Sequence, residues 1–269
     1  MILSSSLPES YFLESIQSAP QQAAQCEKTL ILGWNEKGFG IIQELENYVA
    51  KGSVTQIISD DIALEKKITS LNDELQQQIS FQQGNINDRQ TIIDLKPESY
   101  DHIIVLSSFE LDIQQSDAKT LICLLHLRSI SESLGMEFSI VLEMRDQQNK
   151  ELGVVAKADD FIISDDLISL MISQVSENKF LKNVYDVLFE AEGSEIYLKP
   201  SNQYVISEAK INFHTILESA AQRGETAIGY RRSSEARDLD KNFGIYINPS
   251  KKEIFSLSDD DFVIVLAED

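Results

Sequence analysis

Cysteine is nearly absent from this sequence. The 269 residues contain two cysteines, Cys26 and Cys123, which lie far apart and form no CxxC pair. A disulfide scaffold needs several cysteines, and a cysteine-based zinc site needs a close pair. Both are excluded, and the chain is compatible with a reducing compartment. Cys123 stands in a short apolar run, so we expect it in the core.

Long apolar runs are also missing. No segment reaches the roughly 18 apolar residues that a membrane-spanning helix needs. Residues 1–25 have no basic stretch ahead of an apolar one, which a secretory signal peptide would show. If this polypeptide serves a membrane protein, we expect it to be the water-soluble part.

Basic residues are few relative to acidic ones. There are 23 lysines and arginines against 44 aspartates and glutamates, which gives a formal net charge of -21. Such a charge repels phosphate backbones and anionic lipids, so we expect no nucleic-acid partner. It attracts cations wherever several carboxylates converge, but acidity also serves simply to keep a surface soluble.

What the sequence does contain is an alternation of short apolar runs with amphipathic segments. The runs are typical of buried parallel strands, and the segments between them have helical spacing. Strands separated by helices close as a parallel sheet with right-handed crossovers and helices on both faces. The sequence therefore predicts an α/β fold, a Rossmann-like doubly wound parallel sheet. Its expected strands are 29–34, 54–59, 79–82, 100–106, 138–143 and 160–163.

The alternation stops after Ser164. A helical stretch follows at 165–192, either one helix or two in tandem, and then a small α+β lobe. That lobe has one expected helix, at 213–223, and expected strands at 195–199, 203–206, 226–230, 244–247 and 261–266. The predicted organisation is a linker or N-terminal arm (1–27), a Rossmann-like lobe (28–164), a crossover helix or helix pair (165–193) and an α+β C-terminal lobe (194–269).

The turn after the first expected strand is a degraded dinucleotide-binding fingerprint. Such a turn reads GxGxxG, with the pyrophosphate on the following helix N-terminus. Here Gly33 and Gly38 keep the first and third positions, and Asn35 replaces the middle glycine. Asparagine tolerates left-handed angles, but its side chain intrudes where phosphate would lie. Asp60 ends the second strand, where an acid binds a ribose hydroxyl. These four residues are the candidate nucleotide site; the alternative is that the glycines serve packing.

Four carboxylates are candidates for a metal site: Asp60, Asp61, Glu143 and Asp165. Glu143 ends a strand at the carboxyl edge of the predicted sheet, where open α/β sheets bind ligands. None of the four matches the spacing of an EF-hand. Aspartates of this kind also cap helices, and Asp165 suits the N-cap of the long helix.

Catalytic constellations are missing. The three histidines, His102, His126 and His214, have no metal or triad spacing, and the common nucleophile and phosphate-loop motifs do not occur. The chain is therefore predicted not to be an enzyme. Two alternatives stay open: an NAD(P)-binding oxidoreductase-like protein with a degraded fingerprint, and a protein-interaction domain on a Rossmann scaffold.

Four stretches, spread from residue 30 to residue 249, resemble a known family in their order and spacing. They are LGWNEKG (32–38) with ELENYV (44–49) and GS (52–53) behind it, DFIISDDLIS (160–169), LFEAEGSEIYLKP (188–200), and AIGYRR (227–232) followed by INP (247–249). The chain resembles the RCK (KTN, TrkA-N-like) cytoplasmic domains of Castor/Pollux-type ion channels.

The resemblance implies a Rossmann lobe, a helical crossover and a small C-terminal lobe. In that family two RCK-like units follow the transmembrane part and assemble as a ring beneath the pore. This sequence has room for one unit and looks like the second. The resemblance thus implies a ligand-sensing gating-ring module that regulates a potassium or cation channel or transporter. Its location would be cytoplasmic, at the inner face of a membrane.

Partners follow from the same resemblance, and the candidate ligands also rest on the charge and the degraded fingerprint. The resemblance implies a homo-oligomer, a dimer within a tetrameric or octameric ring, and a transmembrane pore segment on the same or a partner chain. Calcium fits the charge, and a nucleotide of the NAD or ATP type is the other candidate ligand. The helical stretch at 165–192 is the expected lever between lobes. We expect it to form subunit contacts through Ile168, Leu170, Met171, Ile172 and Val175.

Overall fold

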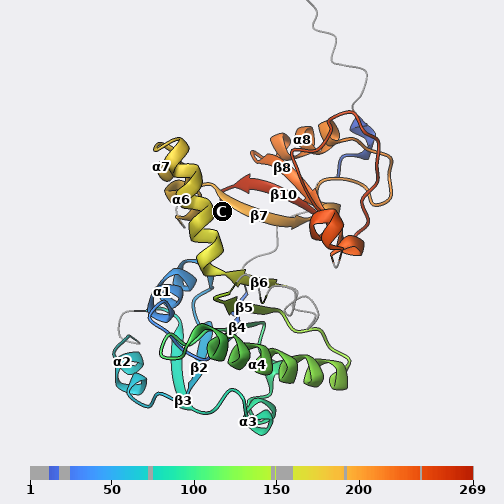
Figure 1. Cartoon of the computed structure of the whole chain (residues 1–269). Coiled ribbons are helices and arrows are strands. Elements are labelled where there is room, and N and C mark those ends of the chain that lie inside the picture. Colours follow the sequence, from blue (N-terminus) through green and yellow to red (C-terminus); the bar gives the residue numbers. More distant parts are fainter. Residues whose placement is uncertain are drawn as a thin grey trace, which may run out of the picture. The chain divides into compact units, whose positions relative to one another are not determined.

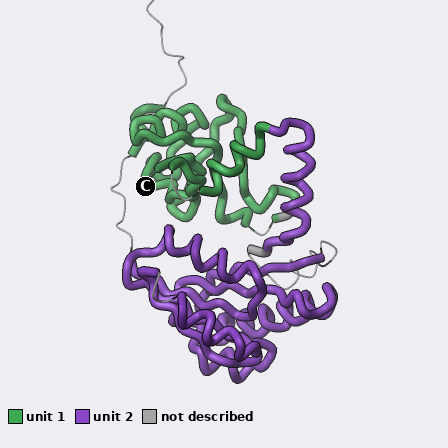
Figure 2. Tube along the Cα trace, turned by 90° about the vertical axis from the view of Figure 1, so that its left-hand side faces the viewer, with its two compact units in different colours: residues 1–22, 180–269 green, residues 23–179 purple. Residues whose placement is uncertain are grey.

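The computed structural model describes residues 12–17, 25–71, 75–146, 149, 160–190, 193–236 and 238–268 (Figure 1). The chain forms two compact units (Figure 2). Residues 23–179 make up the Rossmann unit, and residues 1–22 together with 180–269 make up the C-terminal unit. The C-terminal unit therefore contains segments from both ends of the sequence, and the Rossmann unit is inserted between them.

Six parallel strands form the sheet of the Rossmann unit. They are β1 (Lys28–Leu32), β2 (Val54–Ser59), β3 (Gln78–Gln83), β4 (His102–Val105), β5 (Ile140–Met144) and β6 (Asp160–Ile163). Their order in the sheet is β3-β2-β1-β4-β5-β6. The order reverses between β1 and β4, which pair in parallel. This confirms the doubly wound parallel sheet that the sequence predicts.

The two faces of this sheet have separate cores. Its helices are α1 (Gly38–Tyr48), α2 (Leu64–Leu71), α3 (Arg89–Asp94) and α4 (Ile113–Leu134). Successive strand residues point to opposite faces, so Ile31 of β1 packs in the core of α1 and α2. Its neighbour Leu32 packs in the core of α3 and α4. Cys123 lies in this second core, as expected, and burial raises the pKa of its thiol to about 12.

Side-chain caps explain two helix starts. Asp112 accepts a hydrogen bond from Gln115 N (3.0 Å), so α4 begins at Ile113. Asp88 accepts one from Gln90 N (3.1 Å) and opens α3, a short helix that the sequence pattern does not reveal.

The helical stretch at 165–192 is two helices, α6 (Ser164–Glu177) and α7 (Leu181–Phe189). β6 passes directly into α6, whose N-cap position is Ile163. The expected N-cap role of Asp165 is therefore wrong, because this residue lies inside the first turn beside Asp166. Negative charge in a first turn still favours the helix through its dipole.

The C-terminal unit has a four-stranded sheet in the order β7-β10-β8-β9. Its elements are β7 (Glu195–Pro200), α8 (Phe213–Gln222), β8 (Thr226–Arg231), β9 (Ile245–Ile247) and β10 (Phe262–Ala267). Every strand pair is antiparallel, as in an α+β lobe. Ile216 of α8, Val263 of β10 and the fully buried Tyr204 share its core.

One expected strand of this lobe, 203–206, is absent. Ser201–Gln203 form a 3-10 turn, and Val205 makes only an isolated bridge to Ile16. Residues 12–17, here called the N-terminal strap, thus dock on the C-terminal unit. Gln17 N donates to Tyr204 O (2.9 Å), and Ile206 N donates to Ser15 O (2.8 Å). These contacts attach the strap to the unit that follows the Rossmann unit in sequence.

Candidate functional site

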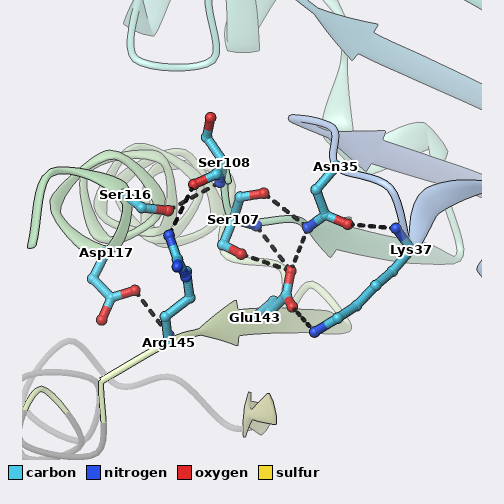
Figure 3. A network of polar contacts seen from close by, with 8 residues as sticks. All are labelled: Asn35, Lys37, Ser107, Ser108, Ser116, Asp117, Glu143 and Arg145. Carbon is cyan, nitrogen blue, oxygen red and sulfur yellow. Dashed lines mark hydrogen bonds and ion pairs between the residues drawn. The ribbon is translucent and has the colours of Figure 1, made fainter. Parts of the chain in front are cut away.

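The candidate site lies at the carboxyl edge of the parallel sheet, where the strand order reverses. Open α/β sheets bind ligands at this position because the loops after neighbouring strands diverge there. Three chain segments meet at it: the Gly33–Gly38 turn after β1, Ser107 and Ser108 after β4, and residues 143–145 at the end of β5 and just after it (Figure 3).

The two retained glycines of the turn are required by its geometry. Gly33 has a φ of +82°, and a Cβ there would lie 2.6 Å from Leu106 O at the end of β4. A Cβ on Gly38 would lie 2.6 Å from the indole of Trp34. Gly38 therefore makes room for a side chain of the turn itself, and any larger residue would displace Trp34.

Asn35 is buried and points into the protein (Figure 3). Its Oδ1 accepts a hydrogen bond from Lys37 N (2.9 Å). Its Nδ2 donates to Ser107 O (2.8 Å) and to Glu143 Oε2 (2.7 Å). The side chain that replaces the middle glycine therefore joins the turn to the ends of both β4 and β5.

Glu143 is the centre of this network and is only 8% exposed. Its Oε1 accepts from Lys37 Nζ (2.8 Å), and its Oε2 accepts from Ser107 N (3.1 Å) and Ser107 Oγ (2.8 Å). Burial acts to raise the pKa of Glu143, but the Lys37 ammonium and the Ser107 donors outweigh it and hold the pKa below its usual value. Glu143 is therefore a charged, fully engaged carboxylate.

A second buried carboxylate, Asp117 of α4, holds the chain just after β5. It accepts from Arg145 N (2.9 Å), Asp146 N (3.0 Å) and Asn149 Nδ2 (2.8 Å). The guanidinium of Arg145 lies 5.1 Å from the Phe109 ring centre, and the ammonium of Lys37 lies 5.2 Å from the same centre. The Phe109 ring therefore lies close to two cations. One is Lys37, which pairs with Glu143, and the other is Arg145, whose backbone N–H bonds Asp117.

The sequence analysis did not single out Asp117, although a signal was present. Asp117 lies at helical spacing from Thr120 and Leu124, which are buried on the side of α4 that packs against the sheet. An acidic residue on the apolar face of a helix is buried when the helix packs, and it then needs donors. Here the donors are mostly backbone N–H groups, which leave no trace in the sequence.

Asp60 and Asp61 lie at the end of β2, as expected, but both carboxylates are engaged. Asp60 Oδ2 pairs with Lys119 Nζ of α4 (2.9 Å), and Asp61 Oδ1 accepts from Ala63 N (2.9 Å). Asp60, Lys119 and Gly33 line a cleft of about 20 Å³. That volume holds about one water, whereas ligand pockets measure about 300 Å³ or more.

The four metal candidates do not form one site. Asp60 and Asp61 follow β2, Glu143 ends β5, and Asp165 opens α6. Across the part of the chain that the structure describes, no group of three or more histidine, cysteine, aspartate or glutamate side chains is arranged to hold a metal ion. The acidic turn before β10 is likewise engaged, because Asp261 accepts from Ser233 N and Ser258 N, both at 2.8 Å.

Comparison with known proteins defines the class of this chain. Residues 29–164 match the TrkA-N domain family, and the chain belongs to that family. The matched residues run from the second residue of β1 to the first residue of α6. No helix within the described ranges is long and apolar enough to cross a membrane.

Curated relatives extend the likeness over most of the chain. It is 27% identical to the probable ion channel POLLUX of Arabidopsis thaliana over 90% of its length. It is also 27% identical to the ion channel CASTOR of Lotus japonicus over 84% of its length. The expected resemblance to Castor/Pollux channels is thereby confirmed. The chain spans about a third of these relatives, 33% and 30% of their respective lengths.

A solved structure shows the same fold. The human SLO3 gating ring matches 90% of this chain and 44% of its own with a TM-score of 0.60. The identity between the two is 12%, so the match shows shared architecture.

Proposed function

We propose that this chain is an RCK-type regulatory module of an ion channel or transporter, acting at the cytoplasmic face of the membrane. The observation that carries the proposal is the extent of the likeness. The similarity to POLLUX covers 90% of the chain, so it includes the C-terminal unit as well as the TrkA-N part. The fold shared with the SLO3 gating ring covers the same fraction and supports the same reading.

A role in binding and coupling fits the site better than catalysis. The polar groups at the carboxyl edge are bonded to one another, with Glu143 held by Lys37, Asn35 and Ser107. A general base must present a free lone pair to its substrate, and this carboxylate is already saturated. The relatives are described as ion channels, which agrees with a non-enzymatic role.

The mechanism we propose is a change of angle between units or between neighbouring copies. A ligand drives such a change only if it binds the two arrangements with different affinity. The chain passes from one unit to the other at Lys179–Phe180, between α6 and α7, which makes this connection the natural hinge. Calcium and a nucleotide of the NAD or ATP type are the ligands to test.

Self-association is the second part of the proposal. No residue of α6 is fully buried, and Leu167, Ile168, Leu170 and Ile172 are 47–64% exposed. Exposed apolar groups on this scale mark interaction surfaces. We propose that a second copy covers α6, as required for a dimer within a tetrameric or octameric ring.

An apolar pocket in the Rossmann unit supports this arrangement. It measures about 260 Å³ and is lined by Ile41, Ile104, Val141 and Ile162, among others. The pocket lies on the face of the parallel sheet against which α1 and α2 pack. These helices cover the half of that face formed by β1–β3, while Ile162 of β6 remains 48% exposed. A doubly wound sheet normally has both faces covered, so a helix from another copy is the occupant we propose.

Light scattering on the purified chain tests the association. Wild type is expected to form a dimer or a larger assembly, and Ile172→Glu is expected to be monomeric because a charge then sits on the apolar face. Gln174→Glu adds the same charge to an exposed position of α6 and should leave the assembly intact. A wild-type chain that stays strictly monomeric at high concentration contradicts this part of the proposal.

Two further measurements test the regulatory role. Titration calorimetry with calcium, NAD and ATP identifies the ligand, and no heat from any of them would leave a purely structural ring. The reading frame upstream of the chain is expected to encode a paired-helix pore segment. If neither that frame nor a co-purifying partner supplies a pore, the channel role is overturned.

A further inference from the structure

Two backbone donors at the Gly38 end of the Gly33–Gly38 turn, Lys37 N and Gly38 N, are already satisfied by the chain itself. In a nucleotide-binding Rossmann domain, backbone N–H groups of this turn face the pyrophosphate. Here Lys37 N donates to Asn35 Oδ1 (2.9 Å), and Gly38 N donates to Asn35 O (3.0 Å). The Lys37 N–H, which a phosphate oxygen would need as its donor, is therefore already bonded to the side-chain oxygen of Asn35.

The positive charge of the turn is also neutralised from within. Lys37 supplies the turn's ammonium, and it contacts Glu143 Oε1 at 2.8 Å. The other oxygen of Glu143 accepts from Asn35 Nδ2 and from Ser107. An incoming phosphate would have to separate this pair and leave the buried Glu143 carboxylate without its cation, which is unfavourable.

We propose that this turn is self-liganded: Asn35 and Glu143 supply from inside the chain the acceptor and the negative charge that a nucleotide would supply from outside. The ends of β1, β4 and β5 are thereby held together without any ligand. The turn does not receive nucleotides, so of the two candidate ligands this inference favours calcium, bound elsewhere in the module. This inference rests on the residues of the turn and does not depend on the channel role.

The neighbouring cleft agrees with this inference. Lys119 and Asp60 form an ion pair at the cleft beside Gly33, where a ribose would be bound. Ribose binding at Asp60 would have to compete with that pair. Both ends of the candidate nucleotide site, the phosphate turn and the ribose acid, are therefore occupied by lysine–carboxylate pairs of the chain.

Restoring the fingerprint tests the proposal. Asn35→Gly turns the segment into G-x-G-x-x-G and removes the bonds of Asn35 to Lys37 N and Glu143, and Glu143→Gln removes the charge that neutralises Lys37. Calorimetry with NAD and ADP is expected to show no binding to wild type. The double variant is expected to bind NAD or ADP with a Kd at least roughly tenfold below the weakest Kd that the measurement can detect.

A matched control separates this effect from loosening of a loop. Asn85 Oδ1 accepts from Asn87 N (3.0 Å) in the loop after β3, a local bond equivalent to that of Asn35. Asn85→Gly breaks that bond and should bind nucleotide no better than wild type. Circular dichroism reports whether each variant is folded, and if the double variant is unfolded, Asn35→Gly alone decides.

Two outcomes overturn the inference. One is wild type binding NAD or ADP as tightly as the restored variant, because the turn would then be open to ligands. The other is a folded restored variant that gains no affinity, because Asn35 and Glu143 would then not be what excludes the nucleotide. Neither outcome bears on whether the chain associates with a pore, so this result and the test of the proposed function are separable.

Discussion

At the scale of single residues, Glu143 is expected to contribute strongly to the stability of the Rossmann unit. It is buried, charged, and bonded to the turn after β1 and to the end of β4. Hydrogen bonds to charged groups contribute about 1.5–3 kcal/mol each, and removing one partner leaves the others unsatisfied. The partial exposure of Lys37 reduces this contribution, since water solvates its ammonium when the pair is lost.

We predict that Glu143→Ala lowers the free energy of unfolding by about 2–3 kcal/mol. Urea denaturation followed by circular dichroism measures this difference. Glu44→Gln, on an exposed position of α1, is the matched control and should change the value by less than about 0.5 kcal/mol. Equal midpoints for wild type and Glu143→Ala would show that the network adds nothing to stability.

The same carboxylate predicts a pH dependence with a defined sign. The folded pKa of Glu143 lies below the ordinary value of 4.5, so the folded state holds the charged form more strongly than the unfolded state does. Its contribution is fully present above about pH 5 and is lost as the pH falls through the folded pKa. The stability difference between wild type and Glu143→Gln should therefore be constant from pH 8 to about pH 5 and shrink below it. A difference that grows on acidification contradicts the assignment.

At the scale of elements, the N-terminal strap is the feature with the clearest mechanical consequence. Phe12 N donates to Thr215 Oγ1 (3.2 Å), and Ser15 is buried against the C-terminal unit. Any tension applied through the chain ahead of residue 12 therefore reaches the C-terminal unit before it reaches β1. In a regulatory module, a force applied to the chain ahead of residue 12 would therefore act first on the C-terminal unit.

We predict that Gln17→Pro releases the strap, because it removes the N–H that bonds Tyr204 O. The loss should be about 1 kcal/mol, and amide hydrogen exchange at Val205 and Ile206 should speed up while β1 stays protected. Leu13→Pro is the matched control, since proline is tolerated at the first position of a helical turn. Equal acceleration in β1 and in residues 204–206 would show that the strap does not act on the C-terminal unit alone.

The elements differ in how far the sequence predicts them. The strands of the Rossmann unit are predictable because burial on both faces demands continuous apolar runs such as Leu30–Leu32. The strap is not, because its bonds to Tyr204 and Ile206 are made by backbone groups that every residue carries. The glycines of the turn are predictable, whereas the inward bonding of Asn35 depends on Glu143, more than a hundred residues later in sequence.

At the scale of the whole molecule, the proposed association predicts that stability depends on protein concentration. If a second copy binds only the folded chain, association stabilises the folded state by mass action, and the thermal midpoint then depends on protein concentration. The exposed apolar side chains of α6, with Ile172 64% exposed, are the surface whose burial would supply this stabilisation. A monomer would have no such dependence.

We therefore predict that the Tm of wild type rises by about 1–2 °C for each tenfold increase in concentration. Differential scanning calorimetry over two decades of concentration measures this slope. Ile172→Glu should abolish it without changing the Tm at the lowest concentration, where even wild type is dissociated, and Gln174→Glu should retain it. A flat wild-type profile would mean that α6 stays exposed in solution and would contradict association through this surface.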